Sequence, residues 1–366
     1  MASYGDVLAA LKDFRNDLEM RVQSDIQNAF HPHAKPLTAF AARGGISAFS
    51  TPLTNVHACG AGVRVRGGKP IPNEYVIKVY VFEKFDLGGA APALTSQQFK
   101  GVDVDVEALP IQKALQRKVS KAANDIAAPV LENRAHRRPI LGGVSIAPIN
   151  EPYVGTLGCL LVRPIGGTEQ IFALSNNHVL ADTNRLQVGT LVVQPGPETA
   201  PTREQDHFGA LNNFIPLLFP KNRLDVAINR FDAALAIVTD HSLVDVRKIL
   251  GIKQYHPELA SAVPGMRVIK SGRTTGVTTG TVTATRVNGV QVDYGTRSMP
   301  LIAAFNDTIE VIGDDGKPFS APGDSGSVIL EEATGRPVAL LFAGDGRTTT
   351  ACDLGGVCQH FQAYPV

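Results

Sequence analysis

The sequence predicts a mainly β fold, preceded by an N-terminal helix and a small α+β segment. Short runs rich in Val, Ile, Leu and Thr recur from residue 155 to the end, with Gly, Asn and Asp between them. Residues 6–28 instead carry apolar side chains at three- and four-residue spacing, which is typical of an amphipathic helix. Strand-like alternation and a second helical pattern fill the stretch between them. These three patterns divide the chain into an N-terminal helix, a small α+β unit and a larger β unit.

Composition limits the classes of protein to which the chain can belong. Its 366 residues, 44% of them hydrophobic, can bury sizeable cores and predict two or three domains. A net charge of +1 argues against nucleic acid or an anionic membrane as the main partner. No apolar run is long enough to span a bilayer, and the N-terminus lacks the pattern of a secretion signal. We therefore expect a cytoplasmic protein.

The cysteines support the same location. There are four, at Cys59, Cys159, Cys352 and Cys358. They are too few and too scattered for a disulfide framework or a zinc site, so buried or free thiols in a reducing compartment are expected. A bridge between Cys352 and Cys358 is the alternative. The sequence gives no signal for a cofactor or a metal.

The first predicted unit, residues 1–36, is the amphipathic helix. Its apolar stripe consists of Val7, Leu8, Leu11, Phe14, Leu18, Val22 and Ile26. We expect this stripe to pack on its own protein or on a second copy, and the second alternative would make the chain a homo-oligomer. His31-Pro32-His33 ends the helix, and this His-x-His lacks the further ligands of a metal site.

The second predicted unit, residues 45–135, is a small α+β domain. The expected strands are Cys59–Val65, Tyr75–Phe82 and Val102–Val106. Residues 111–134 are predicted as a helix that Pro129 kinks or ends. No residue of this unit carries an obvious chemistry, so a role in regulation, docking or support of the larger unit at 140–366 is expected.

One stretch, residues 321–330, carries the strongest chemical signal. It reads Ala-Pro-Gly-Asp-Ser-Gly-Ser-Val-Ile-Leu and presents Ser325 on a sharp turn before an apolar strand. Gly323 and Gly326 can adopt positive φ, which lets the backbone N–H groups of Gly323 and Ser325 converge on a developing oxyanion. An ordinary Gly/Asp/Ser turn between strands is the alternative.

A serine nucleophile needs a base and a group that orients the base. His178 follows the apolar run at residues 170–174 and is the candidate base. Asp232 begins a nearly continuous apolar run, where its buried carboxylate would need a donor such as an imidazole N–H. Asp225 also precedes an apolar run and is a rival for the acid. We favour Asp232 because its strand is longer.

The motifs and their order resemble those of trypsin-like serine peptidases with the chymotrypsin fold. Ser-Asn-Asn-His-Val at 175–179 is similar to the histidine motif of HtrA-type bacterial enzymes. Further matching runs are Gly155-Thr156-Leu157-Gly158, Lys270 to Gly276, Phe319-Ser320-Ala321 and Leu340 to Gly344. Together these runs resemble the family typified by the plant NARROW LEAF protein, over roughly residues 140–366.

This resemblance implies two antiparallel β-barrels with the active site between them. The first barrel would carry His178 and Asp232, and the second Ser325. Residues 216–222 and 244–256 would be a loop and a short helix linking the barrels. The implied activity is hydrolysis of peptide bonds in a protein or peptide substrate through an acyl-enzyme.

The junction at residues 137–144 suggests proteolytic activation. Arg-Arg-Pro-Ile-Leu-Gly-Gly-Val resembles the Ile-Val-Gly-Gly start of mature trypsins, whose new ammonium group pairs with the Asp before the nucleophile. In this chain the pair would be Ile140 and Asp324. Pro139 obstructs cleavage after Arg138, and many bacterial relatives need no such step.

The sequence alone does not determine substrate preference or whether the chain is catalytically active. Trypsins keep an Asp six residues before the serine, but Phe319 stands at that position, so cleavage after basic residues is not supported. Asp345 is either a pocket residue or a solvated turn acid. The chain is predicted to be a serine endopeptidase, and a catalytically quiet binding or assembly module on the same fold is the alternative.

Overall fold

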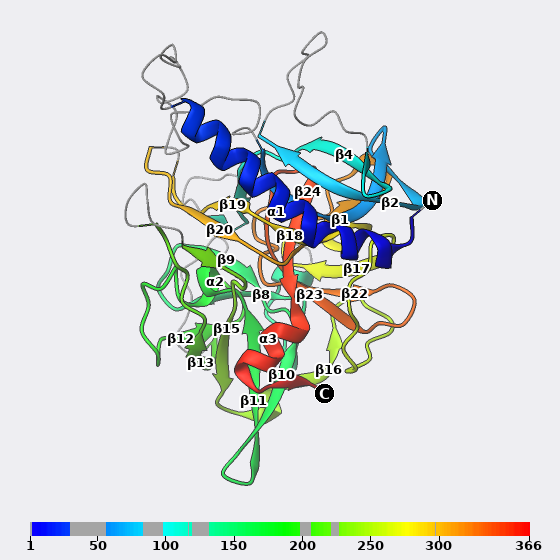
Figure 1. Ribbon diagram of the computed structural model, residues 1–366. Helices are drawn as coiled ribbons and strands as arrows, with labels where there is room; N and C mark the ends of the chain where they lie inside the picture. The colour runs from blue at the N-terminus through cyan, green and yellow to red at the C-terminus, as the bar shows by residue number, and fades with distance from the viewer. Residues whose placement is uncertain are drawn as a thin grey trace.

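The computed structural model describes residues 2–29, 56–82, 98–115, 117–118, 132–197, 206–220, 227–296 and 298–366. Within these ranges most regular structure is β, in one fourteen-stranded and one nine-stranded sheet and a further two-stranded pair. In Figure 1 the nine-stranded sheet forms the lower part of the molecule, and the larger sheet lies above it. The mainly β prediction is confirmed.

Six strands of the larger sheet close into a ring in which every pairing is antiparallel. Around the ring they are β17 (Arg267–Gly272), β18 (Gly276–Asn288), β21 (Thr308–Gly313), β24 (Thr348–Asp353), β23 (Pro337–Gly344) and β22 (Val328–Glu331). Alternating side chains of a closed sheet point inward. Val268, Val282, Val311 and Leu341 are accordingly buried together.

The nine-stranded sheet is the second core of the molecule. Its strands, in spatial order, are β25 (Tyr364–Pro365), β10 (Leu160–Ile165), β11 (Thr168–Ser175), β15 (Ala234–Val238), β13 (His207–Phe214), β12 (Leu191–Val193), β8 (Ser145–Pro148), β9 (Tyr153–Thr156) and β6 (Arg117–Lys118). Ile146, Leu160, Val192 and Phe208 are fully buried or nearly so within it. Helix α3 (Leu354–Phe361) leads from β24 to β25 and so ties the chain end to this sheet.

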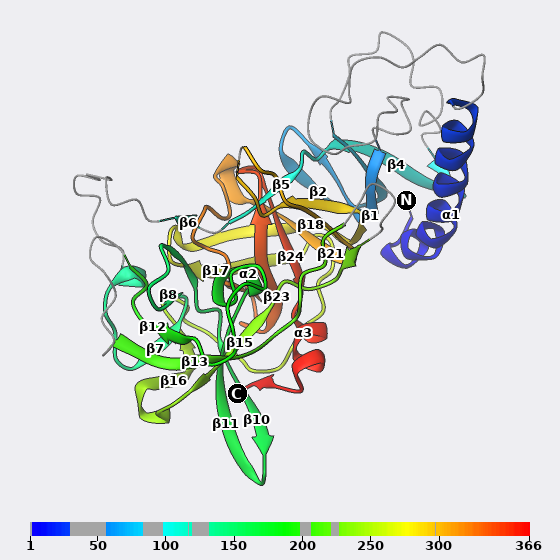
Figure 2. The ribbon, with the colours of Figure 1, turned by 90° about the vertical axis from the view of Figure 1, so that its left-hand side faces the viewer.

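The N-terminal elements extend the larger sheet. They are α1 (Tyr4–Ala29), β1 (Val56–Arg66), β2 (Lys69–Val81), β3 (Gln98–Phe99) and β4 (Val102–Ala108). Because β1 pairs with β18, the sheet is continuous from these strands into the ring. Val7, Leu11 and Phe14 of α1 are buried against β1, β2 and β4 of the same chain, the first of the two alternatives for this stripe (Figure 2).

Two helix predictions are wrong. Residues 112–114 and 117–118 form β5 (Gln112–Ala114) and β6 instead of the start of a helix. The three- and four-residue spacing there is overridden by backbone pairing of β5 with β23 and β19. Residues 116 and 119–131 of that prediction, with Pro129, lie outside the described residues, and its last three residues form a short 3-10 helix, η1 (Glu132–Arg134). Residues 244–249 form β16 (Val244–Ile249), which pairs with β7 (Ile140–Gly142).

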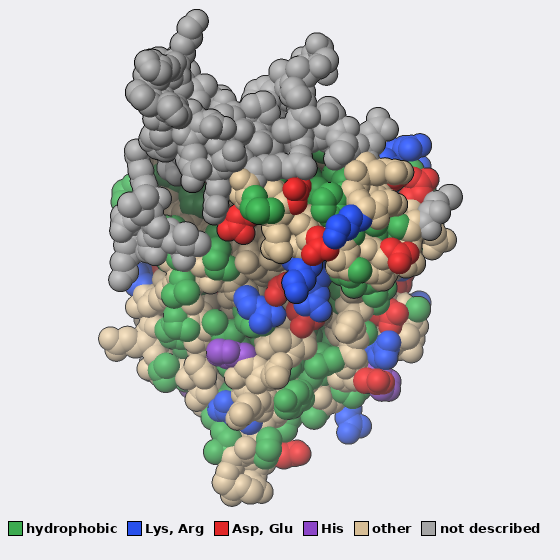
Figure 3. Space-filling model, viewed as in Figure 1, with side chains coloured by type: hydrophobic (Ala, Val, Ile, Leu, Met, Phe, Trp, Pro, Cys, Tyr) green, Lys and Arg blue, Asp and Glu red, His purple; other side chains and the backbone are tan. Residues whose placement is uncertain are grey.

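The remaining described elements are short. They are η1 (Glu132–Arg134), α2 (Asn177–Leu180), β14 (Ile228–Asn229), η3 (His241–Leu243), β19 (Val290–Asp293), β20 (Ile302–Phe305) and η4 (Asp314–Gly316). All four cysteines are buried, free thiols, as expected. Within the described ranges, none of the helices has the length and apolar character needed to cross a membrane. On the face shown in Figure 3, acidic and basic side chains are interspersed.

Candidate active site

Strand pairing brings His178 and Asp232 together. Strands β11 and β15 run antiparallel with Ser175 opposite Ala234, so the end of one strand lies beside the start of the other. His178 follows β11 in the single turn of α2, and Asp232 comes two residues before β15. Asn176 fixes the junction by donating from Nδ2 to the Asp232 carbonyl at 2.6 Å.

Ser325, His178 and Asp232 form one hydrogen-bonded chain. His178 Nε2 lies 2.8 Å from Ser325 Oγ, and His178 Nδ1 lies 2.5 Å from Asp232 Oδ2. The backbone N–H of His178 also donates to Asp232 Oδ1 at 3.2 Å. The three side chains are at most 1% exposed. This is the relative arrangement of nucleophile, base and orienting acid in serine hydrolases.

The turn that carries Ser325 depends on two glycines. Gly323 and Gly326 have φ of +106° and +94°, a region that disfavours side chains. A Cβ on Gly326 would also lie 2.2 Å from both Ser175 Oγ and the Thr156 carbonyl oxygen. The Thr156 N–H donates to the Ser325 carbonyl at 2.8 Å. The turn that carries Ser325, which leads into β22 of the six-stranded ring, is thus held against β9 of the nine-stranded sheet.

Asp324 is buried and bonded to residues other than Ile140. Its carboxylate accepts from the Thr274 N–H at 2.7 Å and the Thr275 hydroxyl at 2.7 Å, and lies 3.3 Å from Lys270 Nζ. Burial lowers the pKa of Lys270, and the charge of Asp324 opposes that shift. Among the described contacts none joins Ile140, which lies in β7, to Asp324. The sequence motif at 270–276 therefore supplies the groups around this carboxylate.

The predicted oxyanion donor at Gly323 is engaged by the chain itself. The Gly323 N–H donates to the carbonyl oxygen of Leu115 at 2.5 Å. Leu115 follows β5 and lies about two hundred residues earlier in the sequence. No pattern in the sequence predicted this contact, because residues 111–134 were expected to be helical.

Tyr294 is a further member of the site that the sequence did not reveal. Its phenol donates to Asp232 Oδ2 at 2.8 Å, and its ring meets the His178 ring edge-on with centroids 5.6 Å apart. Burial and the charge of Asp232 raise the pKa of Tyr294 well above its ordinary value, so the phenol stays protonated and can donate a hydrogen bond to this carboxylate. No motif marks this tyrosine, which follows the short strand β19.

The other residues that the sequence singled out have ordinary surroundings. Phe319 is buried in the ring core together with Leu115. Asp345 accepts from the N–H groups of Arg347 and Thr348 at 2.8 and 2.7 Å, as a turn acid does. It also accepts from Gln112 Nε2 at 3.2 Å. Asp225, the rival acid, lies outside the described residues.

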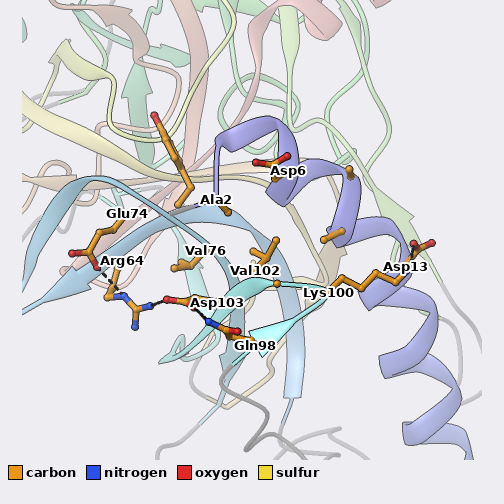
Figure 4. A pocket seen from close by; sticks show the side chains of 14 residues that line it. Ala2, Asp6, Asp13, Arg64, Glu74, Val76, Gln98, Lys100, Val102 and Asp103 are labelled. Atoms are coloured by element: carbon orange, nitrogen blue, oxygen red, sulfur yellow. Dashed lines mark hydrogen bonds and ion pairs between the residues drawn. The ribbon is translucent and has the colours of Figure 1, made fainter.

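A separate hollow lies between α1 and strands β1 to β4 (Figure 4). Arg64 pairs with Glu74 at 3.1 Å and with Asp103 at 2.6 Å, and Asp6 accepts from the Ser3 hydroxyl at 2.8 Å. Lys100 pairs with Asp13 at 2.5 Å. The hollow shares no residue with the Ser325 site. Among the described residues no group of three or more His, Cys, Asp or Glu side chains is arranged to hold a metal ion.

Comparison with known proteins found one family model and several solved structures that are similar to this chain. Residues 223–353 match a family model described as the Nal1 C-terminal domain. A search of curated protein sequences found no match. Similar solved structures include protease A of Thermobifida fusca (TM-score 0.42, 18% identity, 62% of this chain and 98% of that one). A chymotrypsin of Cellulomonas bogoriensis is similar as well, with a TM-score of 0.41 and 17% identity over 62% of this chain and 98% of that one. A glutamic-acid-specific serine protease has a TM-score of 0.41 and 22% identity over 62% of this chain and 100% of that one. These likenesses concern the fold alone.

Proposed function

We propose that this chain is a serine endopeptidase that acts on few substrates. The observation that carries the proposal is the hydrogen-bonded succession of Ser325, His178 and Asp232. The match of residues 223–353 to the Nal1 C-terminal domain supports the finer proposal that the chain is a relative of the NARROW LEAF-like peptidases. A cytoplasmic location and a homo-oligomeric state stay predictions.

Each residue has a role in the proposed reaction. Ser325 Oγ adds to the carbonyl carbon of the scissile bond while its proton passes to His178 Nε2. The C–N bond then breaks as His178 gives this proton to the leaving amine, and water hydrolyses the acyl-enzyme by the same route. Asp232 holds the imidazole and stabilises its charged form. The Gly323 N–H would stabilise the oxyanion, and one such donor contributes roughly 3–4 kcal/mol in serine hydrolases.

Labelling with a fluorophosphonate probe tests the nucleophile. The intact chain should become labelled on Ser325, and Ser325→Ala should abolish labelling, because the probe traps a serine activated by its base. The peptidase-fold binding module, the second candidate function, predicts no labelling in any variant, including those with an emptied cleft described below. That result would sink the proposal.

Hydrolysis of one ester substrate tests the acid. Asp232→Asn should lower kcat by a factor on the order of 10⁴, since the imidazole loses the group that fixes its tautomer. Asp225→Asn is the matched control and should retain activity. Loss confined to the Asp225 variant would reassign the acid.

A further inference from the structure

A stretch of the chain lies across the candidate active site in an extended conformation. We call residues 112–115 the cleft segment. Its β5 part pairs antiparallel with β23, placing Lys113 opposite Gly344 and Ala114 opposite Ala343. The Leu115 N–H then donates to the Phe342 carbonyl at 3.2 Å. That carbonyl also lies 3.2 Å from Ser325 Oγ.

The Leu115 carbonyl is directed at the predicted oxyanion donor. Its oxygen accepts from the Gly323 N–H at 2.5 Å, two residues before the candidate nucleophile. Beyond this point the backbone of β6 pairs with β9 in the other sheet, with Arg117 opposite Val154. The chain is therefore paired with the larger sheet before Leu115 and with the nine-stranded sheet after it, as the β5 and β6 labels in Figure 2 indicate.

The side chains of the cleft segment occupy distinct sites. Leu115 is only 4% exposed and shares an apolar cluster with Phe319 and Leu341. Two residues earlier, Lys113 forms an ion pair with Asp293, which is 6% exposed.

We propose that the cleft segment is bound as a substrate in the protein's own active site and blocks it. This rests on the proposed peptidase function. A strand that merely completes the sheet would not need to direct its carbonyl at the Gly323 amide, whereas a bound substrate must. Occupancy also accounts for the burial of Ser325, whose side chain has no exposed surface.

The same contacts define the class of substrate. The site takes an extended peptide with an apolar residue of leucine size directly before the scissile bond, held by the cluster around Phe319. It prefers a basic residue two positions earlier, where Asp293 is the partner. An external substrate binds only after the cleft segment has left, so the reactive fraction of the enzyme is the fraction with an empty cleft.

The rate of fluorophosphonate labelling of Ser325 measures that fraction. Leu115→Lys should label at least about tenfold faster than the unmodified chain, because a lysine does not fit the apolar site and the cleft empties. Leu115→Ala should also be labelled faster than the unmodified chain, but by a smaller factor. Leu11→Ala is the matched control: it truncates a buried leucine of the separate cluster between α1 and the N-terminal strands, and should leave the rate unchanged.

A peptide added in trans supplies a second test, because only a folded variant with an empty cleft can respond to it. A synthetic peptide with the sequence of residues 110–118 should slow labelling of Leu115→Lys in a concentration-dependent way. The same peptide with lysine at the leucine position should not. Equal labelling rates for the unmodified chain and both Leu115 variants, together with no effect of either peptide, would overturn the proposal while leaving the peptidase function intact. Absence of labelling in every variant would overturn both.

Discussion

A single buried phenol adds a fourth member to the Ser325 site. Tyr294 donates to the same Asp232 oxygen, Oδ2, that lies against His178 Nδ1. Since a carboxylate without exposed surface loses its hydrogen bonds to water, each protein donor replaces one of those lost partners. Tyr294 is thus a positioning residue, acting on the imidazole through Asp232.

Tyr294→Phe should lower kcat by about tenfold without changing KM. A hydrogen bond to a charged group contributes about 1.5–3 kcal/mol, and about 1.4 kcal/mol corresponds to a factor of ten. The Phe ring keeps the packing against His178, so the variant should stay folded and lose no more stability than this one hydrogen bond contributes. Tyr364→Phe, at a half-exposed site, is the control. A rise in KM with unchanged kcat would argue against a positioning role.

At the scale of elements, helix α3 shows how the chain end is fixed to the core. Leu354, Val357, Cys358 and Phe361 are all buried in the main apolar cluster. Asp353 caps the helix by accepting from the Gly356 N–H at 2.7 Å. Burial raises the pKa of Cys358 to about 12, so this thiol stays protonated in the folded protein well above pH 9.

The buried thiol of α3 should make stability fall at alkaline pH. A thiol whose pKa is raised on folding contributes stability below the unfolded pKa, about 9, and that stability is lost as pH rises toward the folded value. The loss amounts to at most about 1.4 kcal/mol per pH unit for one group. Urea unfolding from pH 8 to 11 should show a shallower decline for Cys358→Ala. Val357→Ala should be less stable at every pH, but its stability should fall with pH as steeply as that of the unmodified chain. An equally steep fall in Cys358→Ala and Val357→Ala would contradict the role given to the Cys358 thiol.

At the scale of the whole molecule, a buried cation joins the N-terminal strands to the ring. Lys78 of β2 has no exposed surface, and its Nζ lies 2.9 Å from Glu107 Oε1 of β4 and 3.1 Å from Glu310 Oε1 of β21. Burial favours the neutral amine, but these two carboxylates outweigh it and raise the pKa of Lys78. Together with the pairing of β1 and β18, this network makes the N-terminal strands part of the barrel's sheet.

Lys78→Met should destabilise the protein by about 3–5 kcal/mol. The substitution preserves much of the side-chain volume but leaves two buried carboxylates without their counter-charge. Chemical denaturation followed by circular dichroism would measure the loss. Lys69→Met, on the exposed start of the same strand, should change stability by no more than about 0.5 kcal/mol. A loss below about 1 kcal/mol in the Lys78 variant would show that the network contributes little.

The sequence by itself determined the mainly β class, the amphipathic helix α1 and the candidates His178, Asp232 and Ser325. These follow from local patterns: alternation, helical spacing, and glycines where the backbone needs positive φ. Only the tertiary structure decided that residues 112–115 lie extended beside β23 and Ser325, that Tyr294 holds Asp232, and that Lys270 pairs with Asp324. The physical reason is that these contacts join residues far apart in the chain. A buried polar group or an extended backbone needs a hydrogen-bond partner, but only folding decides which distant residue supplies it, so no local pattern predicts that partner.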